Sequence, residues 1–411
     1  MTLGLLDFIA SSVTVFWRSA KYEGRFLEQH RWDFAVLFWL PIVFIFLVWW
    51  VFSKGAIADL PIAVIDHSHS PSSATLIRYL DATPEVTVQG LLPNAKTGKK
   101  AIEQTQIYAY VEIPESFEKD VLSGNSSRLL LNVNAQFGTH SGMIQKGVQT
   151  AVQTFSAGAE LKRRAALGQD VSIIKNQFSP IQVQSISLFN SSNNYQQFLA
   201  VTIMPALLHI LSMVVGVSVI GRELRDATLA QWYAHISQGI KTSTQPSLWL
   251  LILGLNGKLI LAMLAYALWG LVAFGLVISL KPVALASLGI TYVVFLLFMM
   301  LSFWLGMILT VLTASYRQGL SFTGFISAPA FAFSGVTYPL VAMDPSAQKW
   351  ANALPLTHYL HAQTPQLQMS APASLALPYV YGLLVAVLTT LLLSAILTKK
   401  ALFRAEKWGQ R

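Results

Sequence analysis

The residues with the clearest chemical character lie in a polar stretch, GRELRDATLAQWYAHISQ (221–238), directly after a long apolar run. At helical spacing, Leu224, Leu229 and Trp232 fall broadly on one side of this stretch. The charged residues available on the other side are Arg222, Arg225 and Asp226. A helix of this kind lies along a membrane surface and offers its polar face to a soluble partner. The chemistry we expect here is recognition of another protein; an ordinary juxtamembrane amphipathic helix is the alternative.

Other candidate sites point to little chemistry within the chain. Asp66-His67-Ser68-His69 has two histidines that could bind a metal, but a turn rich in Asp and Ser between a strand and a helix is its usual meaning. Gly98-Lys99-Lys100 and Gly257-Lys258-Leu259 both lack the flanking residues of a phosphate-binding loop. The chain has no cysteine, which excludes disulfides and thiolate metal sites. We therefore predict no catalytic residue, no metal site and no cofactor bound by this chain, with metal binding at His67 and His69 left open.

The composition indicates a membrane protein. Of 411 residues, 54% are hydrophobic and only 11% are charged, whereas soluble domains carry about 25% charged residues. These values exclude a wholly soluble or a disordered chain. The net charge of +9 does not indicate a nucleic-acid partner, because residues 53–195 carry only +1 and the remaining +8 lies beside apolar segments. Anionic membrane lipids are the expected partners of that charge.

Six apolar windows are long enough to cross a bilayer, which takes roughly 20 residues. They are 33–52, 198–220, 259–280, 283–313, 320–341 and 375–398. The fifth is rich in Gly, Ser and Pro and could be broken. Lys and Arg concentrate in residues 1–32, in the connections after the second and fourth windows, and in the tail 399–411. Because positive charge stays in the cytoplasm, both termini are predicted to be cytoplasmic.

The first two windows are separated by a long insert, residues 53–195, which this orientation places outside the cytoplasm. It alternates strand-like and helix-like segments, so we expect a small α/β domain. Ser70 followed by Pro71 predicts a helix start. Residues 140–168 predict one long polar helix, and 179–190 a final strand. The expected fold is thus a polytopic α-helical membrane protein with six transmembrane helices and an inserted extracytoplasmic α/β domain between helices 1 and 2.

The predicted spans hold few ionisable groups. Asp33 and Lys258 lie at the mouths of spans one and three, and His209 is the one interior titratable residue expected. Carriers driven by ions or protons normally bury charged relays. This inventory disfavours a secondary carrier, and a pump would need energy from another chain.

Several motifs together resemble those of ABC type-2 exporter permeases. In that family the loop after the second span resembles R-E-x-x-x-G-T-L-E; Arg222, Glu223, Thr228 and Leu229 fit, whereas Ala227 and Ala230 replace the usual Gly and Glu. Gly257-Lys258 fits the family's Gly-Lys at the start of span three. FSGVTYPL (333–340), Asp344-Pro345 and LPLTHYL (354–360) resemble the stretch that forms short re-entrant helices near the outer leaflet. The order and spacing of these motifs cover essentially the whole chain.

The resemblance implies a permease subunit that is not itself an enzyme and is powered by a separate ABC ATPase subunit, which uses ATP and Mg. It implies a coupling helix at 221–238 within a membrane domain 196–398, and an outer re-entrant segment at 335–362. The residues expected to couple to the ATPase are Arg222, Glu223, Arg225, Thr228, Leu229 and Trp232. The insert resembles that of bacterial permeases with a large periplasmic domain. Those permeases reside in the Gram-negative inner membrane and typically act with a membrane-fusion adaptor and an outer-membrane channel.

A homodimer with two ATPase subunits is expected, with the substrate pathway along the dimer seam between spans one, two and five. Met204, His209, Phe331 and Ser334 are the candidate pathway residues and favour an amphiphilic or hydrophobic substrate. The alternative, which the residue types favour, is that these are packing residues, because small and apolar side chains pack helices closely in lipid. The alternative function is a membrane-anchored envelope enzyme or assembly factor that acts through its periplasmic domain.

Overall fold

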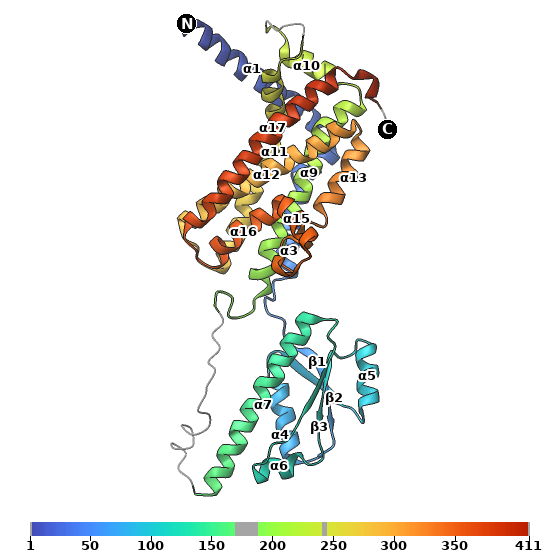
Figure 1. The fold of residues 1–411 in the computed structure, drawn as a ribbon, viewed down its shortest axis with the longest axis vertical. Coiled ribbons are helices and arrows are strands. Elements are labelled where there is room, and N and C mark those ends of the chain that lie inside the picture. Colours follow the sequence, from blue (N-terminus) through green and yellow to red (C-terminus); the bar gives the residue numbers. More distant parts are fainter. Residues whose placement is uncertain (1, 169–187, 241–244, 410–411) are drawn as a thin grey trace. The chain divides into compact units, whose positions relative to one another are not determined.

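The computed structural model of the chain describes residues 2–168, 188–240 and 245–409. The chain divides into two compact units (Figure 1). The first, the helical unit, comprises Met1–Ser53 and Tyr195–Arg411, and the second, the α/β unit, comprises Lys54–Asn194.

Within the described residues, four helical segments of the helical unit are long and apolar enough to cross a membrane. They are η1 with α9 (Gln196–Ala200 and Val201–Arg225), α11 (Leu248–Leu280), α12 (Leu285–Thr313), and η3 with α17 (Ala373–Ala376 and Leu377–Leu402). A fifth candidate is a pair of helices, α2 (Arg31–Leu37) and α3 (Trp39–Val51), bent by 41°. The chain therefore has the helices of a multi-pass membrane protein.

The expected fifth span, 320–341, is not one long helix. Pro329 divides it into α13 (Tyr316–Ser327) and α14 (Ala330–Phe333), because the proline nitrogen carries no hydrogen and cannot donate a backbone hydrogen bond. Short helices follow in the predicted outer re-entrant segment: η2 (Leu340–Ala342), α15 (Pro345–Ala353) and α16 (Pro355–Gln368). The described residues thus hold four or five spanning segments, and the fifth of the six expected spans is a broken one.

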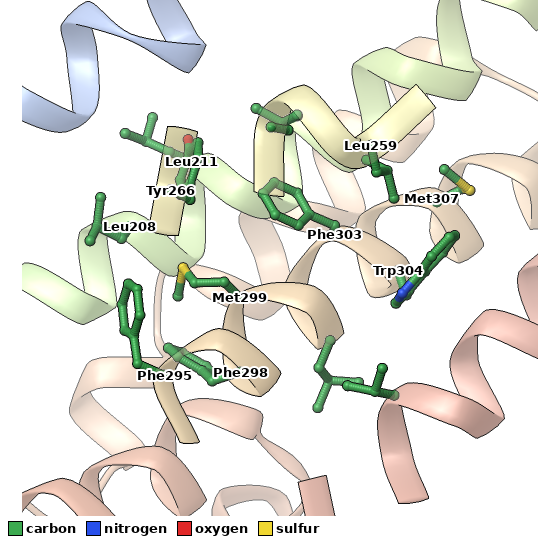
Figure 2. Close-up of a cluster of buried hydrophobic side chains, with 14 of the residues drawn as sticks. Leu208, Leu211, Leu259, Tyr266, Phe295, Phe298, Met299, Phe303, Trp304 and Met307 are labelled. Carbon is green, nitrogen blue, oxygen red and sulfur yellow. The ribbon is translucent and has the colours of Figure 1, made fainter. Parts of the chain in front are cut away.

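The centre of the helical unit is the crossing of α9 and α12. A Cβ atom added to Gly216 would lie 2.1 Å from the carbonyl oxygen of Phe303, and one added to Gly306 would lie 2.1 Å from that of Met213. The two backbones therefore touch where each helix has a glycine, as small residues allow in membrane helices. Figure 2 shows part of the apolar core shared by α9, α11 and α12.

The α/β unit is built on a four-stranded sheet with the order β2-β1-β3-β4. Its strands are β1 (Leu60–Asp66), β2 (Val86–Leu91), β3 (Ala109–Ile113) and β4 (Leu130–Val133); only β4 runs antiparallel to its neighbour. The helices are α4 (Pro71–Asp81), α5 (Ala95–Glu103), α6 (Phe117–Ser123) and α7 (Gly138–Ala166). Alternate residues of β1 supply two cores: Ile62 and Val64 pack with α4, α6 and α7, whereas Ala63 and Ile65 pack with α5 on the opposite face (Figure 1).

Local signals in the insert predicted its elements well. The Ser70 hydroxyl accepts a hydrogen bond from the Ser73 amide at 3.1 Å, with Pro71 in the first turn of α4. The long helix predicted at 140–168 is α7. The strand predicted at 179–190 falls mostly on residues 179–187, which lie outside the described residues.

Candidate functional site

Four charged side chains meet inside the helical unit, where α1 (Thr2–Gln29), α9 and α11 come together. Arg222 donates to Glu23, and the Lys258 ammonium lies 2.6 Å from a Glu223 oxygen and 3.4 Å from a Glu23 oxygen. None of the four side chains is more than 5% exposed. Two carboxylates and two cations balance, as buried charges require, since an unpaired buried charge is very costly. We call Glu23, Arg222, Glu223 and Lys258 the charge cluster.

A glycine on α11, Gly257, allows this cluster to form. A Cβ atom on Gly257 would lie 2.4 Å from the carbonyl oxygen of Phe16, so only glycine permits α1 to cross α11 at that point. The crossing places Glu23 of α1 beside Lys258, the residue that follows the glycine. The Gly257-Lys258 pair therefore acts as a unit, in which the first residue admits α1 and the second bonds to it.

The short helix α10 (Leu229–Ser237) is fixed onto the same junction. Its residues Leu229, Trp232 and Ile236 are buried. The Trp232 indole donates to the Ser19 hydroxyl at 3.1 Å, and that hydroxyl donates to the carbonyl of Gly254 at 2.6 Å. One side chain of α10 thus connects to both α1 and α11. The exposed residues of α10 are Ala230, Gln231, Ala234 and His235.

The turn that joins α9 to α10 shows why glycine is expected at position 227, where this chain has alanine. Ala227 has φ of +56°, in the left-handed region that glycine adopts most easily. Glycine is the residue the resemblance leads one to expect at this position. Thr228 closes the turn, because its amide donates to the Glu223 carbonyl at 2.9 Å and its hydroxyl donates to the Glu223 carboxylate. The turn is therefore bonded directly to the charge cluster.

Tyr22, one residue before Glu23 on α1, contacts two members of the charge cluster. Its hydroxyl lies 3.5 Å from the Glu223 carboxylate, and the Lys258 ammonium lies 4.7 Å from the centre of its ring. Burial, and then the negative charge of Glu223, raise the pKa of Tyr22, which keeps the hydroxyl protonated and able to donate.

The structure corrects several expectations about the coupling segment. Residues 221–238 are not one helix: 221–225 end α9, a turn follows, and α10 begins at Leu229. Arg222 was expected on the polar side that faces the partner, and Glu223 was expected to couple to the ATPase subunit. Both are buried, because they pair with α1 and α11. Arg225 does lie at the surface, where it pairs with Asp226 at 2.8 Å.

The charge cluster was not predicted, because its four residues lie just outside the apolar windows in which few ionisable groups were expected. Lys258, expected at the start of the third span, is the eleventh residue of α11 and is fully buried. Glu23 was not singled out, because its sequence neighbours give no sign that α1 crosses beneath α11. The cluster has no net charge, so it differs from a chain of relay groups; its four members pair with one another.

The candidate pathway residues do not form one site. Met204 and His209 are buried in α9, where the His209 Nδ1 atom lies 2.7 Å from the Ser302 hydroxyl of α12. Phe331 is half-buried against the core of the helical unit. Ser334 instead lines a cavity of about 420 Å³ together with His361 and residues of α9, α16 and α17.

Asp66, in the turn after β1, has a structural role. Asp66 accepts hydrogen bonds from the amides of Ser68 and His69, at 3.0 and 3.1 Å, and from the Ser73 hydroxyl at 2.7 Å. Within the part of the chain that the structure describes, no three His, Asp or Glu side chains are grouped so as to hold a metal ion.

The sequence model of the family described as "ABC-2 family transporter protein" matches residues 31–396, a stretch that includes α2 and most of α17. The chain belongs to the ABC-2 transporter family. No curated protein matches the chain. Membership identifies a multi-pass membrane component of an ABC transporter, and it implies an ABC ATPase subunit as partner. Membrane components of this family are generally not catalytic themselves.

Proposed function

We propose that this chain is the permease subunit of an ATP-driven exporter and that α10 receives the force from a separate ATPase subunit. Three pairs of neighbouring groups support this proposal: Trp232 with Ser19, Lys258 with Glu223, and Arg222 with Glu23. The first bond joins α10 to α1, and the other two join α9 to α11 and to α1, so a displacement of α10 is passed to all three helices.

The exposed side of α10 is the proposed docking surface. It carries small and uncharged polar residues, Ala230, Gln231 and Ala234, together with His235. A surface of this kind allows close approach of a partner and relies on shape rather than on a salt bridge. The charge cluster acts behind this surface, as the connection that transmits movement.

The proposed topology follows from the distribution of positive charge. We place both termini and α10 in the cytoplasm of a bacterial cell and the α/β unit in the periplasm. Six crossings are then needed: α2–α3, α9, α11, α12, the broken α13–α14, and α17. Two ATPase subunits need two permease surfaces, so a homodimer is proposed, and a membrane-fusion adaptor with an outer-membrane channel would continue the route. The proposed substrate is amphiphilic or hydrophobic and leaves from the cytoplasm or the inner leaflet.

Docking and coupling can be tested separately. In Gln231→Trp, a large side chain on the exposed side of α10 should reduce co-purification of the ATPase subunit at least tenfold. Gln136→Trp, on the exposed surface of the α/β unit, is the matched control and should leave co-purification unchanged. Equal co-purification by both variants would refute the assignment of α10.

Glu223→Gln addresses the transmission of movement. The amide has the same shape as the carboxylate but carries no charge for Lys258, so the complex should assemble while substrate-stimulated ATP hydrolysis falls. Normal stimulation in this variant would contradict the role of the charge cluster. Transport by the reconstituted chain alone, driven by a proton gradient without nucleotide, would refute the exporter proposal itself.

A further inference from the structure

A cavity of about 120 Å³ lies between α1, α2, α9 and α11, next to the charge cluster. Its walls are largely apolar and include Val36, Val214, Leu261 and Ala262. Trp32 and Tyr316 also line the cavity, and Trp32 is 86% exposed. An apolar cavity of about 150 Å³ holds a benzene molecule, so this space accommodates a small head group or the beginning of a hydrocarbon chain.

Among the described residues, one acid in the wall of this cavity has no ion-pair partner within 4 Å, although Arg225, which pairs with Asp226, acts on its charge from farther away. Glu23, Arg222 and Lys258 also line the cavity, but they belong to the charge cluster, which is neutral. Asp33 is the remaining charged residue in the wall, and its carboxylate accepts a hydrogen bond from the Ser218 hydroxyl. Within residues 2–168, 188–240 and 245–409, no cationic group lies within 4 Å of the Asp33 carboxylate. The cavity and the cluster together therefore carry one uncompensated negative charge.

The depth of Asp33 makes this charge significant. Ser218, its hydrogen-bond partner, lies seven residues before the end of α9, which is about 10 Å along the helix. On the proposed orientation, this depth corresponds to the inner leaflet. Asp33 is half-buried, and a carboxylate at this depth in a bilayer is costly unless a cation joins it. The exposed ring of Trp32 would favour the same sign of charge, because aromatic faces attract cations. The ring of Tyr316 already has the Arg225 guanidinium 5.3 Å from its centre.

The geometry points to a binding site for a lipophilic organic cation, whose ammonium group would lie against Asp33 with its hydrocarbon chain along Val36, Val214 and Leu261. An anionic head group would face the Asp33 carboxylate, whereas the nearby cations Arg222, Lys258 and Arg225 are already bonded to other acids. This inference rests on the proposed function, in which it defines the substrate class, and it places the site of uptake at the inner leaflet.

Binding is measured with decyltrimethylammonium as the probe and decanol as its uncharged counterpart. The full-length chain is reconstituted in nanodiscs of zwitterionic lipid, and uptake by empty nanodiscs is subtracted. We expect saturable binding of the cation to the wild type and at least tenfold weaker binding to Asp33→Asn. Asp344→Asn, which removes an exposed acid from the same unit, should bind like the wild type.

A second variant guards against misfolding of the first. Val214→Phe fills the cavity and leaves Asp33 in place, so it should also weaken binding while the thermal unfolding midpoint remains near that of the wild type. Equal binding by the wild type and Asp33→Asn would overturn the inference. So would binding of decanol that is as tight as that of the cation, since the carboxylate would then contribute nothing.

These binding measurements use the chain without its ATPase subunit. A failure here leaves co-purification with the ATPase untouched, so the substrate class would be wrong and the exporter proposal would stand. Conversely, loss of the ATPase interaction with intact cation binding would refute the exporter proposal alone.

Discussion

Replacing Lys258 with methionine tests whether the charge cluster stabilises the junction of α1, α9 and α11. Methionine fills similar space without charge, so Glu223 loses a cation at 2.6 Å and Glu23 loses one at 3.4 Å. Removing one partner of a buried ion pair costs about 3–5 kcal/mol. Because Arg222 still bonds to Glu23 and Thr228 still bonds to Glu223, we expect the lower end, about 3 kcal/mol.

The free energy of unfolding is measured for the full-length protein in mixed micelles with increasing denaturing detergent. Lys349→Met is the control, because Lys349 is exposed and such surface changes stay within about 0.5 kcal/mol. Adding Glu223→Gln to Lys258→Met removes the stranded carboxylate. The double variant should therefore be at least about 1 kcal/mol more stable than the sum of the two single effects predicts.

Two results would refute this reasoning. If Lys258→Met unfolds with the same free energy as Lys349→Met, the buried ammonium does not stabilise the fold. If the unfolding free energy of the double variant falls by the sum of the two single effects, Lys258 and Glu223 contribute independently and the charge cluster is not energetically coupled.

Three further predictions concern other parts of the chain. Ala227→Gly should stabilise the protein by up to about 1 kcal/mol in the same unfolding assay, since a left-handed alanine is strained by about 1–2 kcal/mol and glycine is not; a loss of stability would contradict this. Gly306→Ala should destabilise by at least about 1–3 kcal/mol, because its Cβ would lie 2.1 Å from the Met213 carbonyl oxygen, whereas Gly275→Ala, which meets no atom within 4 Å, should be neutral or stabilising. Arg163 and Arg164, one turn along α7, hold the pKa of Glu160 at about 2. The ion pairs of Glu160 therefore stabilise α7 above its ordinary pKa of 4.5, and this stabilisation is lost as the pH falls towards 2. Hydrogen exchange at the end of α7 should speed up over this pH range, and Glu160→Gln should remove the pH dependence.

Periodicity and local capping signals were reliable guides to individual elements. Leu229 and Trp232 were placed on the apolar side of the coupling segment, and both are buried. Ser70 and Pro71 marked the start of α4 correctly. These features depend on residues within a few positions of one another, so the sequence displays them directly.

The same local reasoning failed where a long segment had to be divided. The stretch 221–238 carries a continuous helical pattern, yet the left-handed Ala227 ends one helix before the next begins. By contrast, Gly, Ser and Pro in 320–341 correctly indicated a break, which lies at Pro329 between α13 and α14.

The sequence by itself determined that this chain is a membrane protein, where its apolar helices lie and to which family its motifs are similar, because composition, periodicity and short motifs are written along the chain. Tertiary structure alone decided which charges are buried together. Glu23 lies 200 residues before Glu223 in the sequence, so nothing local indicates that the two share one cluster. They come together because Gly257 lets α1 cross α11. Whether an acid is a solvated surface group or half of a buried pair depends on what packs against it, and helix packing brings together residues that the sequence keeps far apart.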